Sequence, residues 1–440
     1  MSNSTSFHRQ ILGIALPAIV SNITVPLLGL VDVAIVGHLG AASYIGAIAV
    51  GGMLFNMIYW LFGFLRMGTS GLTAQAYGRK DPTEAMRLLL RSTGIGMAIA
   101  TVLIVLQVPL RSAAFLFVDA SPEVRELATR YFHICIWGAP ATLGLYSLTG
   151  WFIGMQNSRY PMLVAIAQNV VNILGSLLFV YGCGLKVEGV ALGTLIAQYA
   201  GLLMAVALWR RRYASLPFPR QEVWQPAAMR RFFQVNRDIF LRTVCLVSVM
   251  TFFTATGAAY GDDLLAVNTL LMQLFTFFSY VMDGFAYAGE ALAGRYTGAA
   301  DRASFRLTLR SLFQWGIGLS AAFTLTYAVG GRPFLGLLTD NAEVLTLATA
   351  WFPWVLAIPF AGFTAFLMDG ICIGATATRI MLWGVAVASV CFFALYFGIR
   401  AEYGNHALWL AFIVYLVVRG GVSLFLTLRK EQKNTPVYLL

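Results

Sequence analysis

Apolar stretches with no charged side chain recur along the whole 440-residue chain. Twelve of them are comparable in length to a bilayer-crossing helix, which takes about 20 residues. These stretches are residues 10–31, 33–65, 92–110, 131–158, 160–185, 189–209, 243–261, 264–282, 311–331, 344–368, 380–399 and 403–418. Hydrophobic residues make up 59% of the chain and charged residues only 11%, too few to cover a soluble fold. The sequence therefore predicts an all-α polytopic membrane protein with twelve transmembrane helices.

Basic residues concentrate in alternate connections between the predicted spans. If both termini lie on one face of the membrane, that face holds 21 of the 30 Lys and Arg residues and the opposite face six. By the positive-inside rule the richer face is cytoplasmic, so we expect cytoplasmic N- and C-termini. The same rule accounts for the net charge of +11, which removes the support for nucleic-acid binding.

Signatures of soluble catalysis and of metal binding are missing from the sequence. It contains no Walker A, GxSxG or HExxH motif, and its His and Cys residues lack metal-ligand spacing. We therefore expect a protein that is not an enzyme, and any pumping has to draw on an ion gradient. An intramembrane enzyme is an alternative that would have to use His133 or His406.

The two halves of the chain align with a constant offset equal to half the chain length, which we call the repeat offset. Gly150-Trp-Phe-Ile-Gly154 aligns with Gly370-Ile-Cys-Ile-Gly374 at this offset. Two lobes of six helices each would share their orientation, because six is even, and a parallel pseudo-two-fold axis would relate them. We expect an N-lobe at residues 1–209, a cytoplasmic linker at 210–229 and a C-lobe at 230–440. Such repeats favour a cavity with alternating access, and a duplicated channel is an alternative.

Asp32 is the strongest candidate for a functional residue. An ionisable group at membrane depth is costly, so it suggests function rather than packing. Asp32 lies less than two helical turns after Pro26, whose missing N–H favours a kink in the first span. The position one repeat offset later is Phe252, so the second lobe lacks this acid. A proton or cation site on one lobe explains this asymmetry better than a structural salt bridge.

The fifth span carries a narrow polar stripe. Its residues Gln168, Asn169, Asn172 and Ser176 recur at helical spacing on an otherwise apolar helix. Their side chains can hydrogen-bond a carboxyl group in either protonation state, and Thr194 in the sixth span can join them. The alternative role for this stripe is helix–helix packing.

The eighth span carries a second polar face, which predicts the lining of a cavity. Its residues are Thr269, Gln273, Thr276, Tyr280, Asp283, Tyr287 and Glu290. With Asp369, a further acid at membrane depth, we take Asp283, Tyr287 and Glu290 as candidate residues of a C-lobe cation site. Arg66 in the second span has an alternative structural role, as the partner of an acid such as Glu290.

The first span, from Leu16-Pro-Ala-Ile-Val to Gly37-His-Leu-Gly40, closely resembles the multidrug and toxic compound extrusion (MATE) family, and its DNA-damage-inducible (DinF) branch most of all. The resemblance extends over nearly the whole chain. Further matches are Leu65-Arg-Met-Gly-Thr-Ser-Gly-Leu-Thr-Ala-Gln-Ala-Tyr-Gly78, Asn236-Arg-Asp-Ile239, Asp283-Gly-Phe-Ala-Tyr287, Asp369-Gly370 with Ile373-Gly-Ala-Thr376, and Asn405-His-Ala-Leu-Trp-Leu410.

The resemblance implies a V-shaped pair of six-helix lobes around a central cavity, in the inner membrane of a bacterium. It implies export of lipophilic organic cations and drugs in exchange for H⁺ or Na⁺, by a monomer that contacts membrane lipids and needs no cofactor. The family's coupling acid in the first helix matches Asp32, and its fifth-helix asparagine matches Asn172. Where many relatives carry a second aspartate this chain has Ser176, which favours H⁺ because Na⁺ prefers several oxygen ligands. Asp369 resembles an acid of Na⁺-coupled relatives, so Na⁺ coupling stays open.

The mechanism that we expect is exchange at one shared carboxyl group. Protonation of Asp32 from outside would let the first helix bend at Pro26, shrink the N-lobe cavity and expel the drug. Loss of the proton to the inside would then allow a cation to bind. A Na⁺-coupled exporter is one alternative, and a lipid or glycolipid flippase with a wide basic cavity is another.

Overall fold

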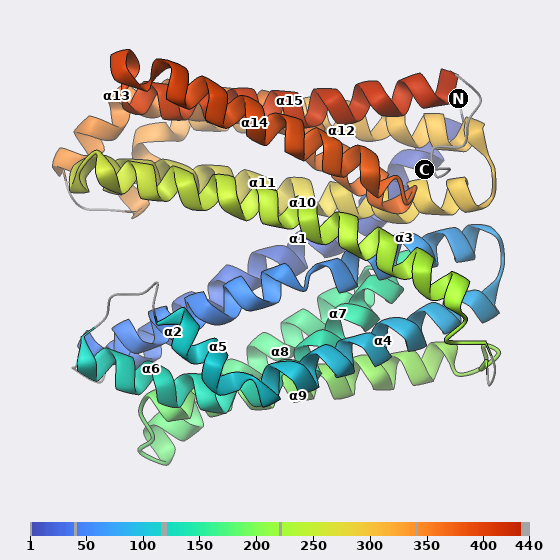
Figure 1. The fold of residues 1–440 in the computed structure, drawn as a ribbon, viewed down its shortest axis with the longest axis horizontal. Coiled ribbons are helices and arrows are strands. Elements are labelled where there is room, and N and C mark those ends of the chain that lie inside the picture. Colours follow the sequence, from blue (N-terminus) through green and yellow to red (C-terminus); the bar gives the residue numbers. More distant parts are fainter. Residues whose placement is uncertain (1, 39–41, 116–120, 220–221, 339–341, 433–440) are drawn as a thin grey trace. The chain divides into compact units, whose positions relative to one another are not determined.

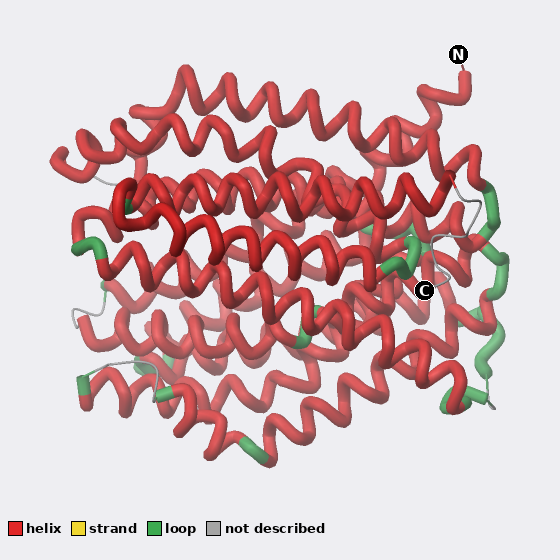
Figure 2. Tube along the Cα trace, turned by 45° about the horizontal axis from the view of Figure 1, so that its top comes forward, coloured by secondary structure: helices red, strands yellow, loops and turns green. Residues whose placement is uncertain are grey.

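The computed structural model describes residues 2–38, 42–115, 121–219, 222–338 and 342–432. All regular structure within these ranges is helical, and Figure 2 shows short loops joining long helices. The elements of the first half are α1 (Ser2–Gly37), α2 (Ala42–Leu61), α3 (Phe64–Gly78), α4 (Pro82–Val105), α5 (Gln107–Ala114), α6 (Pro122–Cys135), the 3-10 turn η1 (Ile136–Gly138), α7 (Ala139–Gly154), α8 (Arg159–Leu177), the π-helical turn η2 (Leu178–Gly182) and α9 (Val187–Tyr213). Those of the second half are α10 (Pro226–Ala259), α11 (Asp262–Gly298), α12 (Arg302–Leu338), α13 (Ala342–Gly374), α14 (Thr378–Tyr403) and α15 (Asn405–Gln432).

Within the described residues, eleven helical stretches are long and apolar enough to cross a membrane. The remaining predicted span, residues 131–158, is divided among the end of α6, the turn η1 and α7. Pro140 lies in the first turn of α7, where its missing N–H is tolerated, but it cannot continue a hydrogen-bonded helix from α6. A scan for charge-free stretches does not detect this break, because the residues around it are apolar.

The chain forms two compact units, which we call the N-unit (Leu16–Phe233) and the C-unit (Met1–Ala15 with Gln234–Leu440). The start of α1 belongs to the C-unit because its side chains pack there. The Phe7 ring lies 5.8 Å from the Tyr296 ring, and the Tyr296 hydroxyl donates to Gln10 Oε1 over 3.1 Å. Figure 1 labels the helices and colours them by their position in the sequence. The two lobes expected from the sequence, residues 1–209 and 230–440, have other boundaries than these units and stay a prediction.

The internal repeat is visible in the closest helix contacts of each unit. A Cβ atom added to Gly150 would collide with the carbonyl oxygen of Arg66, and one added to Gly370 would collide with that of Ala286. Ala286 follows Arg66 by the same repeat offset that separates the two glycines. The glycines therefore allow α3 to approach α7, and α11 to approach α13, in equivalent ways.

Two loop positions repeat with the same left-handed backbone. Lys80 has a φ of 58° and Ala300 a φ of 54°, while Gln156 has a φ of 64° and Thr376 a φ of 50°. The members of each pair are separated by the repeat offset. Non-glycine residues with such φ values are uncommon, so their recurrence indicates two copies of one fold.

Candidate functional site

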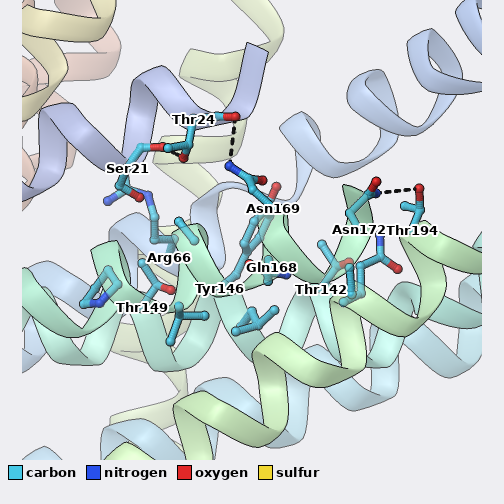
Figure 3. A pocket seen from close by; sticks show the side chains of 16 residues that line it. Ser21, Thr24, Arg66, Thr142, Tyr146, Thr149, Gln168, Asn169, Asn172 and Thr194 are labelled. Carbon is cyan, nitrogen blue, oxygen red and sulfur yellow. Dashed lines mark hydrogen bonds between the residues drawn. The ribbon is translucent and has the colours of Figure 1, made fainter. Parts of the chain in front are cut away.

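The N-unit contains a cavity of about 290 Å³ among α1, α3, α7, α8 and α9 (Figure 3). Its polar lining residues are Ser21, Thr24, Arg66, Thr142, Tyr146, Thr149, Gln168, Asn169, Asn172, Thr194 and Gln198. Arg66 is the one charged residue among those that line it. In Figure 3, Arg66 and Asn172 lie at different places along the cavity. Of the predicted stripe on α8, Gln168, Asn169 and Asn172 line this cavity, and Ser176 is not among its lining residues.

Asp32 lies beside this cavity but is not part of its lining. The side chain is buried in α1, within hydrogen-bonding reach of Asn172 and Ser176 on α8. Asn172 Nδ2 donates to Thr194 Oγ1 over 3.0 Å, and Ser176 Oγ donates to Asn172 Oδ1 over 3.2 Å. Because Asn172 also lines the cavity, it connects Asp32 to that space. The structure thus brings together four of the residues that the sequence indicated.

Among the described residues, the carboxyl group of Asp32 has no basic partner. Its Oδ1 atom is buried without a hydrogen-bond partner, and none of the described Lys or Arg residues forms an ion pair with it. Its further titratable neighbours are Tyr131 and Cys135 on α6. Neither residue was predicted from the sequence as part of the site. Their spacing of four residues puts them on one face of α6, but it does not indicate that this face lies beside Asp32.

Hydrogen bonds hold α1 on both sides of Asp32. Asn169 Nδ2 donates to the carbonyl oxygen of Thr24 over 3.0 Å, just before Pro26. The Tyr181 hydroxyl, in the π-helical turn η2, donates to the carbonyl oxygen of Ile35 over 2.9 Å. The structure therefore places Asn169 on the backbone of α1, and Tyr181 is a contact that the sequence analysis missed.

The C-unit surrounds Asp369 with positive charge. Arg242 and Arg419 both form ion pairs with its Oδ2 atom, and all three side chains are buried. Arg419 also interacts electrostatically with Asp283, which is half-buried on α11. A cation that bound at Asp369 would have to compete with two guanidinium groups.

The other predicted residues of the C-unit follow one another along α11. Tyr287 is half-buried and Glu290 is buried. Glu290 belongs to the tightly packed part of the helix, since a Cβ atom added to Gly374 would collide with the carbonyl oxygen of Glu290. Arg66 and Glu290 belong to different units, so their pairing stays a prediction.

At the repeat positions that correspond to the Asp32 cluster, the C-unit is aromatic. Phe252 corresponds to Asp32, and its ring lies 5.9 Å from that of Phe392 and 5.3 Å from that of Tyr396. These two residues follow Asn172 and Ser176 by the repeat offset. Equivalent positions are therefore in contact in both units, but aromatic rings in the C-unit replace the carboxyl, amide and serine groups of the N-unit.

A helical membrane fold with an internal repeat, a polar cavity and a buried acid that has no counter-ion in the described part of the chain indicates a secondary membrane transporter. A family model described as MatE matches residues 17–178 and 239–397. The chain therefore belongs to the multidrug and toxic compound extrusion (MATE) family, whose members are transporters and not enzymes.

Individual relatives agree with this membership. The chain is 38% identical over 437 residues to DNA damage-inducible protein F of Escherichia coli, covering 99% of this chain and 95% of the relative. It is 25% identical to the probable multidrug resistance protein NorM of Synechococcus, covering 97% and 95%. The fold matches the Vibrio cholerae MATE transporter VcmN, solved in the bent form, with a TM-score of 0.87 at 18% identity and 100% coverage of both chains. The protein is thus a multi-pass membrane transporter of a family that exports drugs and toxic compounds.

Proposed function

We propose that this transporter exports lipophilic organic cations in exchange for protons, and that Asp32 is the residue at which the two compete. The observation that carries the proposal is the burial of Asp32 beside a polar cavity without a basic partner in the described part of the chain. A buried carboxylate without a counter-ion is destabilised by the loss of its hydration, and binding either a proton or a cation relieves that cost.

The neighbours of Asp32 support exchange between two protonation states. An amide such as that of Asn172 has both donor and acceptor atoms, and the Ser176 hydroxyl has both as well. These groups can therefore donate to a carboxylate and can accept from a carboxylic acid. A guanidinium partner, such as those of Asp369, would stabilise only the charged form.

The ligand set favours H⁺ over Na⁺. The cluster contains one carboxyl group, and Asn172 Oδ1 already accepts from Ser176. A hard cation prefers several oxygen ligands. A cluster with a second aspartate would have more carboxylate oxygens available than this cluster has. In the C-unit, Asp369 is already neutralised by Arg242 and Arg419.

The proposal includes where the substrate binds. Arg66 disfavours a positive group nearby, so we expect the cationic end of the substrate near Asn172 and its apolar body along the rest of the cavity. Neutralisation of Asp32 would weaken attraction for that end, which couples proton uptake to substrate release. We expect α1 to bend near Pro26 during this step.

The proposed membrane arrangement follows from the sequence. We expect a monomer in a bacterial inner membrane, with both termini in the cytoplasm and with two lobes at residues 1–209 and 230–440. Protons would then enter from the outer face, where the gradient supplies them.

Reconstituted vesicles test the coupling residue. Efflux of a fluorescent organic cation driven by a pH gradient should fall by about tenfold or more in Asp32→Asn, because the amide cannot exchange a proton. Asp262→Asn, at the exposed start of α11, is the matched control and should transport at the wild-type rate. Undiminished pH-driven efflux by Asp32→Asn would reject the role of Asp32. Wild-type efflux that follows a Na⁺ gradient and ignores a pH gradient would reject proton coupling.

A further inference from the structure

A second cavity lies at the opposite end of the N-unit's α3 from Arg66. It has a volume of about 260 Å³, between the end of α3, the start of α4 and the first turns of α10. Its charged lining residues are Arg79, Glu84, Arg91 and Arg231. Three guanidinium groups therefore face one carboxylate. The positive-inside pattern predicts that this end of the protein is cytoplasmic.

The carboxylate is already engaged by arginines. Glu84 Oε1 lies 2.6 Å from Arg91 Nη1, and its Oε2 lies 3.6 Å from Arg87 Nη1. Arg91 is itself buried, and it also donates to the carbonyl oxygens of Val223 and Glu222. Arg91 is thus a fixed wall of the cavity, and Glu84 is shared between Arg91 and Arg87.

The remaining two arginines are exposed to solvent at the mouth of the cavity. Arg231 donates to Gln75 Oε1 over 3.0 Å, and this contact with a neutral amide directs its guanidinium group. Arg79 forms no ion pair with any residue that the structure describes. The small side chains of Ala227 and Ala228 form the facing wall and leave the space between the arginines open.

We propose that this cavity binds a phosphate group. A guanidinium group matches phosphate oxygens with two parallel hydrogen bonds, so converging arginines are well suited to this anion. Basic pockets at the cytoplasmic ends of membrane helices are suited to the head groups of anionic phospholipids. A soluble phosphate carries the same chemistry. The bound group would contact the end of α3, the start of α4 and the start of α10 together.

Binding to the purified full-length protein in a neutral detergent tests this site. The probes are a short-chain phosphatidylglycerol, the matching short-chain phosphatidylcholine and inorganic phosphate, each titrated while thermal unfolding is followed. Wild-type protein should be stabilised by phosphatidylglycerol, by inorganic phosphate or by both, more than by phosphatidylcholine. Arg79→Gln combined with Arg231→Gln should weaken that binding by about tenfold or more, because each charge-assisted hydrogen bond contributes strongly to affinity. Arg91 is left unchanged because it holds the segment that contains Val223.

Arg429→Gln, an exposed arginine at the end of α15, is the matched control and should bind as the wild type does. Inorganic phosphate as the one responsive probe would identify a soluble ligand, and phosphatidylglycerol as the one responsive probe would identify a lipid. The proposal would be overturned if the double variant and Arg429→Gln bound the anionic probes with equal affinity. It would also be overturned if the wild type did not prefer the anionic probes to phosphatidylcholine. An unchanged unfolding temperature of the double variant without ligand verifies that it is folded.

Discussion

Two buried acids in this protein, Asp32 and Asp369, have opposite surroundings. Asp32 has neutral neighbours, whereas Asp369 lies between Arg242 and Arg419. A carboxylate with two guanidinium partners stays ionised, and removing it would leave two buried positive charges. We therefore propose that Asp369 stabilises the C-unit and that Asp32 takes part in ion exchange. Both residues satisfy the same sequence criterion, an acid at membrane depth, so their partners make the difference.

At the residue scale, Gly150 tests the contact between α3 and α7. Gly150→Ala should destabilise the protein by about 1–3 kcal/mol, because its Cβ atom would collide with the carbonyl oxygen of Arg66 and force the helices apart. Gly52→Ala on α2 is the control, since a Cβ atom there meets nothing within 4 Å. Thermal unfolding in detergent measures both variants. Equal stability of the two would show that α7 moves away without cost.

At the element scale, α1 contains two prolines that differ in their distance from the site. Pro26→Ala should stabilise the straight form of α1 by up to about 3 kcal/mol, which is the difference in helix propensity between proline and alanine. It should therefore slow pH-driven efflux. Pro17→Ala makes the same chemical change in the same helix but farther from Asp32, and it should leave the efflux rate unchanged. Efflux at the wild-type rate in Pro26→Ala would remove the hinge from the mechanism, without affecting the role of Asp32.

The start of α12 depends on a capping aspartate outside the membrane spans. Asp301 Oδ1 accepts from the backbone N–H of Ser304 over 3.0 Å, and this bond holds the pKa of Asp301 below its usual range. A carboxyl group with a lowered pKa in the folded state stabilises the fold above its unfolded-state pKa, and this stabilisation is lost as the pH falls through the folded-state value.

Unfolding temperatures at two pH values test this cap. Asp301→Ala should cost about 0.5–2 kcal/mol at neutral pH, because it leaves the first N–H groups of α12 without a side-chain acceptor. Asp301→Asn keeps the acceptor but cannot titrate. The stability of the wild type relative to Asp301→Asn should therefore be highest at pH 7 and should decrease towards pH 3. A difference that does not depend on pH would contradict the role of the ionised carboxylate.

At the scale of the whole molecule, the two units share a backbone design and differ in their polar residues. The left-handed turns and the glycine contacts recur at the repeat offset, so the helices of both halves pack by the same rules. The site does not recur, since Phe252 and its aromatic neighbours replace Asp32 and its polar neighbours. The recurring glycines and turns lie at other positions than the Asp32 cluster, so the two units share these backbone contacts and still differ in the chemistry of the cluster.

Much of the fold could be predicted from the sequence. Membrane helices satisfy their own backbone hydrogen bonds, so an apolar run of about 20 residues is sufficient to indicate a span. The break between α6 and α7 was not predicted, because a single proline in an apolar run is compatible with either a kinked or a divided helix. The packing of Phe7 and Gln10 on the C-unit depends on contacts with Tyr296, which no local sequence pattern encodes.

The candidate site could be predicted in part, where its residues follow one another along a single helix. Helical spacing identified Asn169, Asn172 and Ser176 as one face of α8. Asp32 was identified because an ionisable side chain inside the bilayer costs free energy. Spacing along one helix cannot reveal which face of another helix it meets, so Tyr131, on α6, was not assigned.

Bilayer thickness and helical periodicity act on neighbouring residues along the chain, so the amino-acid order was sufficient to indicate the class of this protein, its repeat and the candidate residues of its site. The three-dimensional contacts were needed to show which buried acid has arginine partners and which lies beside a cavity. That distinction depends on distances between side chains far apart in the chain, and these distances control the free energy of a buried charge.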